Sequence, residues 1–173
     1  MNILLRYSAL LLLLTSMING FSQGQGMHLH GRTFELNLLD SSESKVGEIP
    51  LEVFLDGSLF LEITSGKSGK YNCFLPFGEV YFVHYGKAPF VEKIIEFDLT
   101  NVGGKTERSG FSLDLDMAIF QTEDAVIKLL HQEPVAKGAY SKRDDLIVFD
   151  SKYSQQHGNQ VRRLIQAWRE NQK

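Results

Sequence analysis

The chain has 173 residues, of which 43% are hydrophobic and 11% aromatic, and this is enough to form the packed core of one domain. The formal net charge of −3 argues against a nucleic-acid-binding surface, because such a surface needs clustered Lys and Arg to neutralise phosphates. Twelve Phe and six Tyr favour β structure. Composition therefore predicts a β-rich domain without a nucleic-acid partner.

The first residues have the pattern of a secretory signal peptide. Arg6 supplies a positive charge, residues 7–18 form an apolar run, and Gly20 and Ser22 stand at small-residue positions before a cut after Ser22. The run is shorter than the ~20 residues of a membrane-spanning helix. We predict a signal peptide over residues 1–22, export to the periplasm, cell surface or medium, and no transmembrane segment in the mature chain. An uncleaved membrane anchor is the alternative.

From His28 onward, apolar and polar residues alternate, which is typical of strands with one buried face. Turn residues such as Asp56-Gly57 separate the runs, and residues 80–85 are apolar on both faces, as in a central strand. Seven short strands with no helix between them predict a mainly β fold, a seven-stranded antiparallel sandwich. The residues expected to share a buried face are Phe34, Leu36 and Leu38; Leu51, Val53 and Leu55; Leu59, Leu61 and Ile63; Tyr71, Cys73 and Leu75; Ile95, Phe97 and Leu99; and Phe111, Leu113, Leu115 and Met117.

Cys73 is the only cysteine, so an exported form of this chain has no internal disulfide. It stands between Tyr71 and Leu75 at alternating positions of a predicted strand. A reactive thiol needs a helix N-terminus or a nearby base, and neither is evident. We therefore expect Cys73 to be a small buried apolar residue.

Beyond residue 119 the pattern changes to that of a C-terminal extension, residues 119–173, with one or two helices. Residues 122–134 suit a short helix that Thr122 begins and Pro134 ends. Residues 144–153 are compatible with one more strand, and residues 159–171 place apolar side chains, including Trp168, at helical spacing. This last helix either packs on the sandwich or docks on another protein.

Gly66-Lys67-Ser68 resembles the end of a phosphate-binding loop. Such a loop needs another Gly five residues earlier and a helix after it. Leu61 stands at the earlier position, and residues 70–76 alternate like a strand. The segment is therefore predicted to be a turn with solvated lysines, and no nucleotide partner is expected.

The same segment carries a resemblance to a known family. The matching residues, which resemble the core of carboxypeptidase regulatory-like domains, are Gly31, Pro50-Leu51-Glu52-Val53, Thr64, Gly69-Lys70-Tyr71, Leu75-Pro76, Gly78 and Tyr81. The resemblance covers about residues 28–117 of the predicted domain, residues 28–118, and implies a transthyretin-like sandwich found in exported bacterial proteins. It also implies a non-catalytic module that aids folding, attaches other domains, or binds partners and sugars, without a shared active site. Ser68 departs from the family pattern, which has Asp before the turn Gly, and the Gly or Ala usual after Pro-Leu is missing.

Residues that carry chemistry do not form a recognisable constellation in the sequence. His28 and His30 share one face of a strand, but a zinc site needs three or four protein ligands. Asp114 and Asp116 fall on the polar face of an alternating strand, which indicates solvated acids rather than an acid/base pair. We expect no metal, no cofactor and no enzymatic activity.

Aromatic residues give the best indication of a binding surface. If the strand faces are as assigned, Phe54, Phe60 and Phe74 point away from the core, where they would contact sugars or be covered by residues 120–173. Together with Trp168 they form the predicted ligand or partner surface. The sequence predicts an exported non-catalytic module acting in binding or assembly at the bacterial cell envelope, with an envelope protein or a glycan as partner. The alternative is a carbohydrate-binding module that uses the exposed aromatics.

Overall fold

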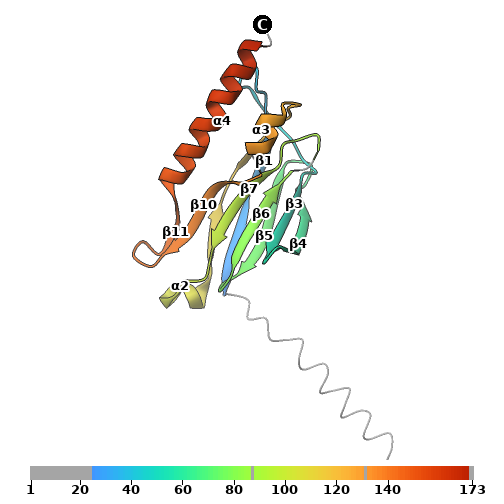
Figure 1. Cartoon of the computed structure of the whole chain (residues 1–173). Coiled ribbons are helices and arrows are strands. Elements are labelled where there is room, and N and C mark those ends of the chain that lie inside the picture. The colour runs from blue at the N-terminus through green and yellow to red at the C-terminus, as the bar shows by residue number, and fades with distance from the viewer. Residues whose placement is uncertain (1–24, 87, 131, 172–173) are drawn as a thin grey trace, which may run out of the picture.

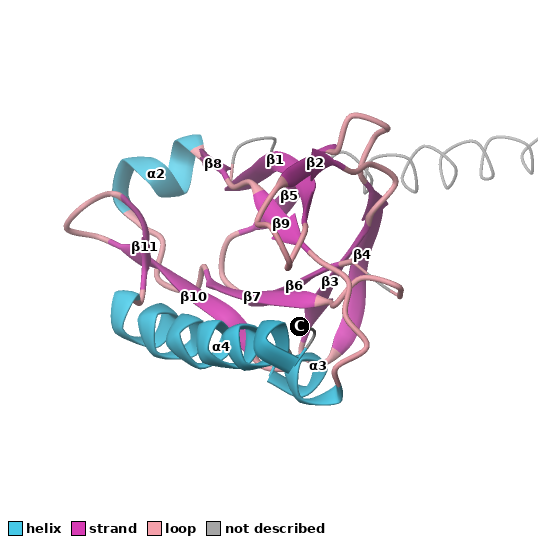
Figure 2. Ribbon diagram, turned by 90° about the horizontal axis from the view of Figure 1, so that it is seen from above, coloured by secondary structure: helices cyan, strands magenta, loops and turns pink. Residues whose placement is uncertain are grey.

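The computed structural model describes residues 25–86, 88–130 and 132–171. The predicted signal peptide lies outside the described residues. Two β-sheets pack face to face, and a long C-terminal helix lies on the outer side of one sheet (Figures 1 and 2). No helix in the described ranges has the length and apolar character needed to cross a membrane. The prediction of a mainly β sandwich with a helical C-terminal extension is confirmed.

The first sheet has five strands built around β1 (Gly26–Leu36). On β1, Met27 and Leu29 point into the core and are fully buried, while His28 points outward. β1 pairs antiparallel with two strands and parallel with two others. These partners are β2 (Glu43–Lys45) and β5 (Lys70–Pro76), which are antiparallel, and β8 (Phe111–Asp114) and β9 (Met117–Ile119), which are parallel.

The second sheet has six strands in the order β11-β10-β7-β6-β3-β4. β6 is central, as its two apolar faces predict, and Asp56-Gly57 joins β3 to β4 with positive φ angles of 49° and 75°. β10 pairs parallel with β7, whereas the other pairs are antiparallel. The strands are β3 (Pro50–Leu55), β4 (Ser58–Thr64), β6 (Val80–Tyr85), β7 (Lys93–Asp98), β10 (Pro134–Ser141) and β11 (Leu146–Phe149).

Three helices complete the described chain: α2 (Gly104–Ser109), α3 (Ala125–Leu130) and α4 (Ser151–Asn171). α4 begins eight residues before the predicted start at 159, because the Asp150 carboxylate accepts a hydrogen bond from the Tyr153 N–H at 2.9 Å and caps the helix. The Tyr153 hydroxyl then donates to the Pro134 carbonyl at 2.7 Å and ties α4 to β10. The N-terminal half of α4 is therefore attached to the edge region of the six-stranded sheet.

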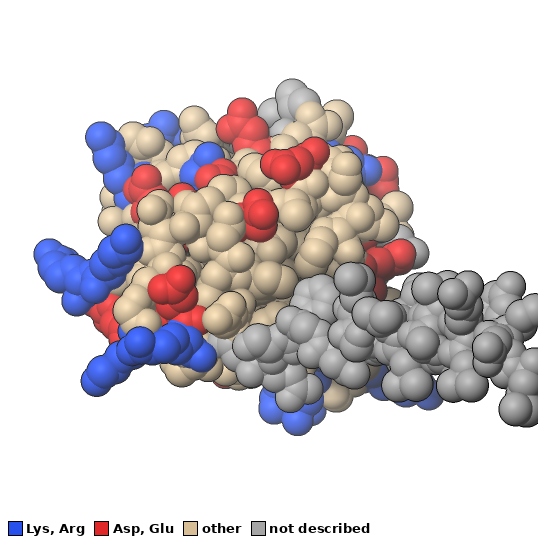
Figure 3. Space-filling view, turned by 90° about the horizontal axis from the view of Figure 1, so that it is seen from below, with Lys and Arg blue, Asp and Glu red and all other residues tan. Residues whose placement is uncertain are grey.

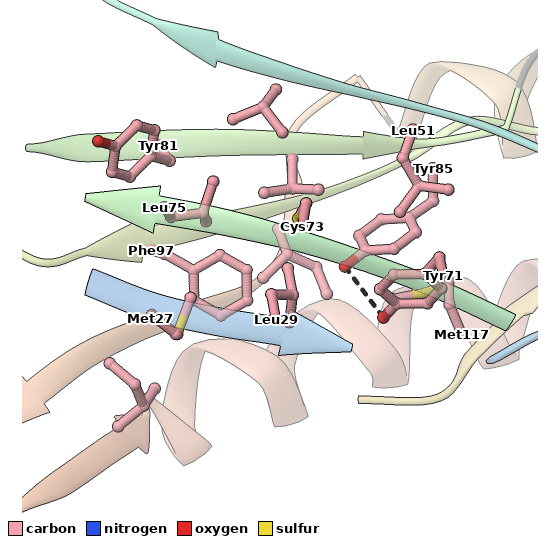
Figure 4. Packing of buried hydrophobic residues seen from close by; sticks show 14 of the residues in the cluster. Met27, Leu29, Leu51, Tyr71, Cys73, Leu75, Tyr81, Tyr85, Phe97 and Met117 are labelled. Atoms are coloured by element: carbon pink, nitrogen blue, oxygen red, sulfur yellow. Dashed lines mark hydrogen bonds between the residues drawn. The ribbon is translucent and has the colours of Figure 1, made fainter. Parts of the chain in front are cut away.

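The main core lies between the two sheets (Figure 4). Leu29, Leu51 and Leu75 are fully buried there, and Cys73 is buried as predicted. Burial raises the pKa of the Cys73 thiol to about 11, so this residue is a poor nucleophile near neutral pH. The Tyr71 hydroxyl lies 3.3 Å from the Tyr85 hydroxyl and also donates to a backbone carbonyl, so the buried phenols are satisfied.

A second cluster forms where α4 meets the end of β1. It contains side chains from the loop after β1, from the segment before β7, from α3 and from the C-terminal half of α4. Leu36 and Leu38, expected to face the main core, pack here instead. The core face of β1 carries the odd-numbered Met27 and Leu29, so Leu36 lies on the opposite face, and Leu38 follows the end of the strand. The members are Leu36, Leu38, Val91, Phe120, Ile127, Leu164, Ile165 and Trp168.

Several details of the predicted sandwich are wrong. The sheets contain five and six strands rather than seven in total, and three of the pairings are parallel rather than antiparallel. α2 lies between β7 and β8, where no helix was expected. Pro134 begins β10 instead of ending a helix, since α3 stops at Leu130. Residues 134–149 thus add two strands to the six-stranded sheet, of which β11 falls within residues 144–153, where one more strand was predicted, and β10 was not expected.

Candidate functional site

The structure does not bring the predicted aromatic residues together. Phe54 lies on β3 with its ring centroid 4.6 Å from that of His84, and Phe74 lies on β5 with its ring 4.9 Å from that of His28. The two residues belong to different sheets, point to the outer face of each, and are half-buried. These rings therefore do not form one platform on which a sugar could stack.

Phe60 takes a different orientation from the one predicted, because β4 contains a β-bulge. Val53 pairs with Leu61 and Phe54 with Leu59, so Phe60 is an extra residue on the β4 side. The Phe60 ring lies 5.6 Å from the ring of the core residue Tyr81, yet 45% of the residue is exposed. Leu59, expected to be buried, is instead 53% exposed. The bulge thus reverses the predicted faces at the start of β4.

Trp168 stabilises the position of α4. It is partly buried in the second cluster, against the loop after β1 and against α3, and α4 packs mainly on β10 and α3. The interpretation of this helix as one packed on the sandwich is therefore confirmed. Trp168 does not lie beside Phe54, Phe60 or Phe74 in the described core clusters.

Exposed apolar side chains are concentrated at the two edges of the six-stranded sheet. Of the five large exposed hydrophobic residues in the described ranges, four lie on β4 and β11. These two strands are the first and last of that sheet (Figure 1). The four residues are Leu59, Phe60, Leu146 and Val148.

The edge strands differ in how well they are protected against pairing with another strand. β2 has only three residues, all polar and exposed, and β11 has four residues after a turn that carries Lys142, Arg143 and Asp144. The largest group of Lys and Arg on the face drawn in Figure 3 lies at its left, the side where Figure 1 places α2 and β11. β4 has seven residues, and Glu62 is its only charged side chain. Short length and charge protect an edge strand, so β4 is less protected than β2 and β11. β5, at an edge of the five-stranded sheet, has the same length as β4 and also carries one charged residue, Lys70.

Backbone hydrogen bonds show which groups of β4 point outward. The Gly86 N–H donates to the Pro50 carbonyl at 3.0 Å, so Pro50 faces β6 and the next residue, Leu51, faces β4. Leu51 pairs with Ile63, and therefore the N–H and C=O of Ile63 point toward β3. By alternation, the N–H and C=O of Glu62 point away from the sheet. This row of groups is available to an added strand.

A polar groove of about 880 Å³ reaches the end of β4. It runs over the outer face of the five-stranded sheet, where His30 pairs with Asn72 of β5 on one side and with Asp114 of β8 on the other. Within the described residues, no group of three or more His, Cys, Asp or Glu is arranged to hold a metal ion. Asp116 is used structurally, because its carboxylate accepts the Arg32 backbone N–H at 2.7 Å. The groove adjoins β4 through Ile63 and Thr64.

The segment that resembled a phosphate-binding loop is the turn between β4 and β5. The Gly66 N–H donates to the Lys70 carbonyl at 2.8 Å, and the Gly69 N–H donates to the Gly66 carbonyl at 2.8 Å. Gly69 has a φ of +79°, which an L side chain rarely adopts. Backbone groups that would hold a phosphate are engaged in this turn, which confirms the interpretation as a turn.

No family model and no curated protein matches this chain. Similar solved structures include a minor pilin of Streptococcus agalactiae, at 6% identity over 58% of this chain and 47% of the pilin, with a TM-score of 0.39. Catechol 1,2-dioxygenase of Pseudomonas arvilla has 9% identity over 62% of this chain and 56% of the enzyme, with a TM-score of 0.37.

A membrane-associated protein of unknown function from Bacteroides fragilis has 14% identity over 58% of this chain and 30% of that protein, with a TM-score of 0.30. The chain thus matches about half or less of the length of the pilin and of this protein. At TM-scores below 0.5, these likenesses identify neither a family nor a function for the chain.

Proposed function

We propose that this chain is a non-catalytic module, exported to the cell envelope, that binds or assembles with another protein by strand addition at β4. The observation that carries the proposal is the combination on β4 of an unpaired outward backbone edge with the exposed side chains of Leu59 and Phe60. An extended partner segment would gain main-chain hydrogen bonds from the edge and apolar contacts from these side chains.

The same strand has features that would restrict pairing to a matching partner. The bulge at Phe60 bends the first part of β4, and Glu62 places a charge in the second part. Bulges and charges of this kind hinder indiscriminate edge-to-edge aggregation. A partner strand that accommodates both is therefore expected to bind selectively.

The candidate catalytic groups support a non-catalytic role. Cys73 is a buried thiol with a raised pKa, caused by desolvation. The Asp145 carboxylate accepts hydrogen bonds from the hydroxyls of Thr106 and Tyr140, which lower its pKa and join α2 to β10. These groups hold the fold together, because Cys73 lies in the core and the hydrogen bonds of Asp145 join α2 to β10.

A pair of substitutions at one position tests the proposal. Glu62→Pro removes the outward N–H while leaving the ladder to β3 intact, and Glu62→Gln retains this N–H but removes the charge. We expect a defined envelope protein to be cross-linked by the wild type and by Glu62→Gln, and to be lost with Glu62→Pro. Far-UV circular dichroism of all three proteins would confirm that they are folded.

Equal cross-linking of the Pro and Gln variants would contradict strand addition at β4. Binding on a glycan array that is lost in Phe54→Ala or Phe74→Ala would instead favour the carbohydrate-binding alternative. Turnover in a broad hydrolase screen would overturn the non-catalytic assignment.

A further inference from the structure

A cavity of about 650 Å³ lies between α4 and the body of the domain. Figure 2 shows α4 running along the outer side of the six-stranded sheet, beside β10. The floor of the cavity is formed by the loop after β1, by Lys93 at the start of β7 and by Val135 on β10. The other wall is the inner face of α4, from Ser154 to Arg169. The volume is within the range of small-molecule binding sites.

The charged residues that line this cavity all carry positive charge. They are Lys93, Arg162 and Arg169, and the described lining contains no Asp or Glu. Arg169 is held in place because it donates to the Leu38 carbonyl and to the Ser41 hydroxyl, the latter at 3.0 Å. A concave site with one sign of charge raises the local concentration of ligands of opposite charge. The charge of the lining therefore favours an anion.

Lys93 is the cation that an anion would neutralise most effectively. No acid of the described chain forms an ion pair with it, and its ammonium lies 5.4 Å from the centroid of the Phe120 ring. On the adjacent strand, by contrast, Lys137 pairs with Glu96 at 2.7 Å. Burial lowers the pKa of Lys93 to about 8. Placing a charge in such an environment without a counter-ion is unfavourable, so a bound anion would stabilise it.

Ser154 on α4 lines the same cavity. The Ser154 Oγ is buried and has no hydrogen-bond partner among the described residues. His157, one turn further along α4, is also buried in the lining, and desolvation lowers its pKa. An unsatisfied buried hydroxyl is uncommon in folded proteins, and an anionic acceptor would satisfy it.

Beside the polar side chains of Ser41 and Gln166, the cavity wall has an apolar part. It is formed by Leu36, Leu38, Val135, Val161 and Ile165. We infer that the cavity binds an amphipathic monoanion, with a carboxylate or phosphate head at Lys93 and Ser154 and an apolar body along these side chains. This inference is independent of strand addition at β4, because it involves a different part of the molecule.

Isothermal titration of the purified chain with decanoate tests the inference. We expect saturable binding with one site, weaker binding of hexanoate, and no measurable binding of decanol, which has the same body without the charge. The same titration is carried out with decyl phosphate and with inorganic phosphate. The comparison distinguishes binding of a phosphate amphiphile from binding of a free anion. Lys93→Met should weaken decanoate binding by about tenfold or more, because a charge-assisted contact is lost.

Two further variants keep the result interpretable. Lys137→Met removes a lysine of the same sheet that does not line the cavity, and it should bind decanoate like the wild type. Val161→Phe fills the apolar part and should abolish binding even if Lys93→Met does not fold. Equal decanoate affinity in the wild type, Lys93→Met and Val161→Phe would overturn the inference. Inorganic phosphate that binds as tightly as decanoate would overturn the amphipathic part.

Discussion

The two edges of the six-stranded sheet differ in their surroundings and in the strand that forms them. On one side, α4 packs along β10, and the short strand β11 follows a charged turn in which Asp145 is bound by two hydroxyls. On the other side, β4 is longer, carries exposed Leu59 and Phe60, and has an outward row of backbone groups. Exposed apolar side chains occur on both edges, so they do not by themselves define a binding site. Length distinguishes β4 from β11, because seven residues present a longer row of outward backbone groups than four.

The largest expected effect comes from breaking the inward ladder of β4. Ile63→Pro removes a hydrogen bond to β3 and a partly buried side chain, and we expect it to lower the free energy of unfolding by about 4 kcal/mol. Glu62→Pro, one residue earlier on the outward side, should lower it by only about 1 kcal/mol. Urea unfolding followed by far-UV circular dichroism measures both. Equal losses of unfolding free energy in the two variants would show that the outward backbone groups of β4 are also hydrogen-bonded. In that case β4 would not have a free edge.

On the side of the sheet that α4 covers, we expect a smaller effect on the free energy of unfolding, and this effect depends on pH. The pKa of Lys93 falls from 10.5 to about 8 in the folded chain because of burial. Between these values the unfolded chain binds more protons than the folded chain, so the penalty for burying the Lys93 charge is relieved as pH rises, by up to about 3 kcal/mol. The free energy of unfolding of the wild type minus that of Lys93→Met should therefore rise from pH 8 to pH 10. The raised pKa of Cys73 acts in the opposite direction in both proteins and cancels in this difference.

Lys137→Met is the matched control for this measurement. The pKa of Lys137 is raised by its hydrogen bond to Glu96, so its stabilising effect is retained through pH 10 and is lost only at higher pH. The rise between pH 8 and pH 10 should persist in this variant. A difference curve for Lys93→Met that is flat over this interval would show that Lys93 is fully solvated, and would weaken the anion site beneath α4.

Much of the sandwich could be predicted because alternation is a local property. Tyr71, Cys73 and Leu75 are buried as expected, and residues 80–85 form a central strand. The cap at Asp150 was also visible in the sequence, as an Asp immediately before the first residue of a helix, and it would have given the start of α4. Local rules therefore predicted the strands and could have given one helix boundary.

The remainder depends on contacts between distant residues. Alternation cannot reveal the bulge at Phe60, because the extra residue is defined only by its pairing with β3. Alternation also cannot show that β4 is an edge strand. It reports which face of a strand is buried, whereas the order of strands in a sheet depends on pairing between distant residues. Lys93 and Ser154 gave no signal for the same reason, as they meet only when α4 folds back over β7 and β10.

Amide hydrogen exchange resolved by residue tests the central claim that β4 has a free outward edge. In the isolated, folded chain we expect the amides of Glu62 and Thr64 to exchange rapidly and those of Leu61 and Ile63 to be protected. The alternation follows from the register with β3, in which Ile63 pairs with Leu51. Comparable protection of all four amides would contradict the account, because it would mean that the outer edge of β4 is already paired.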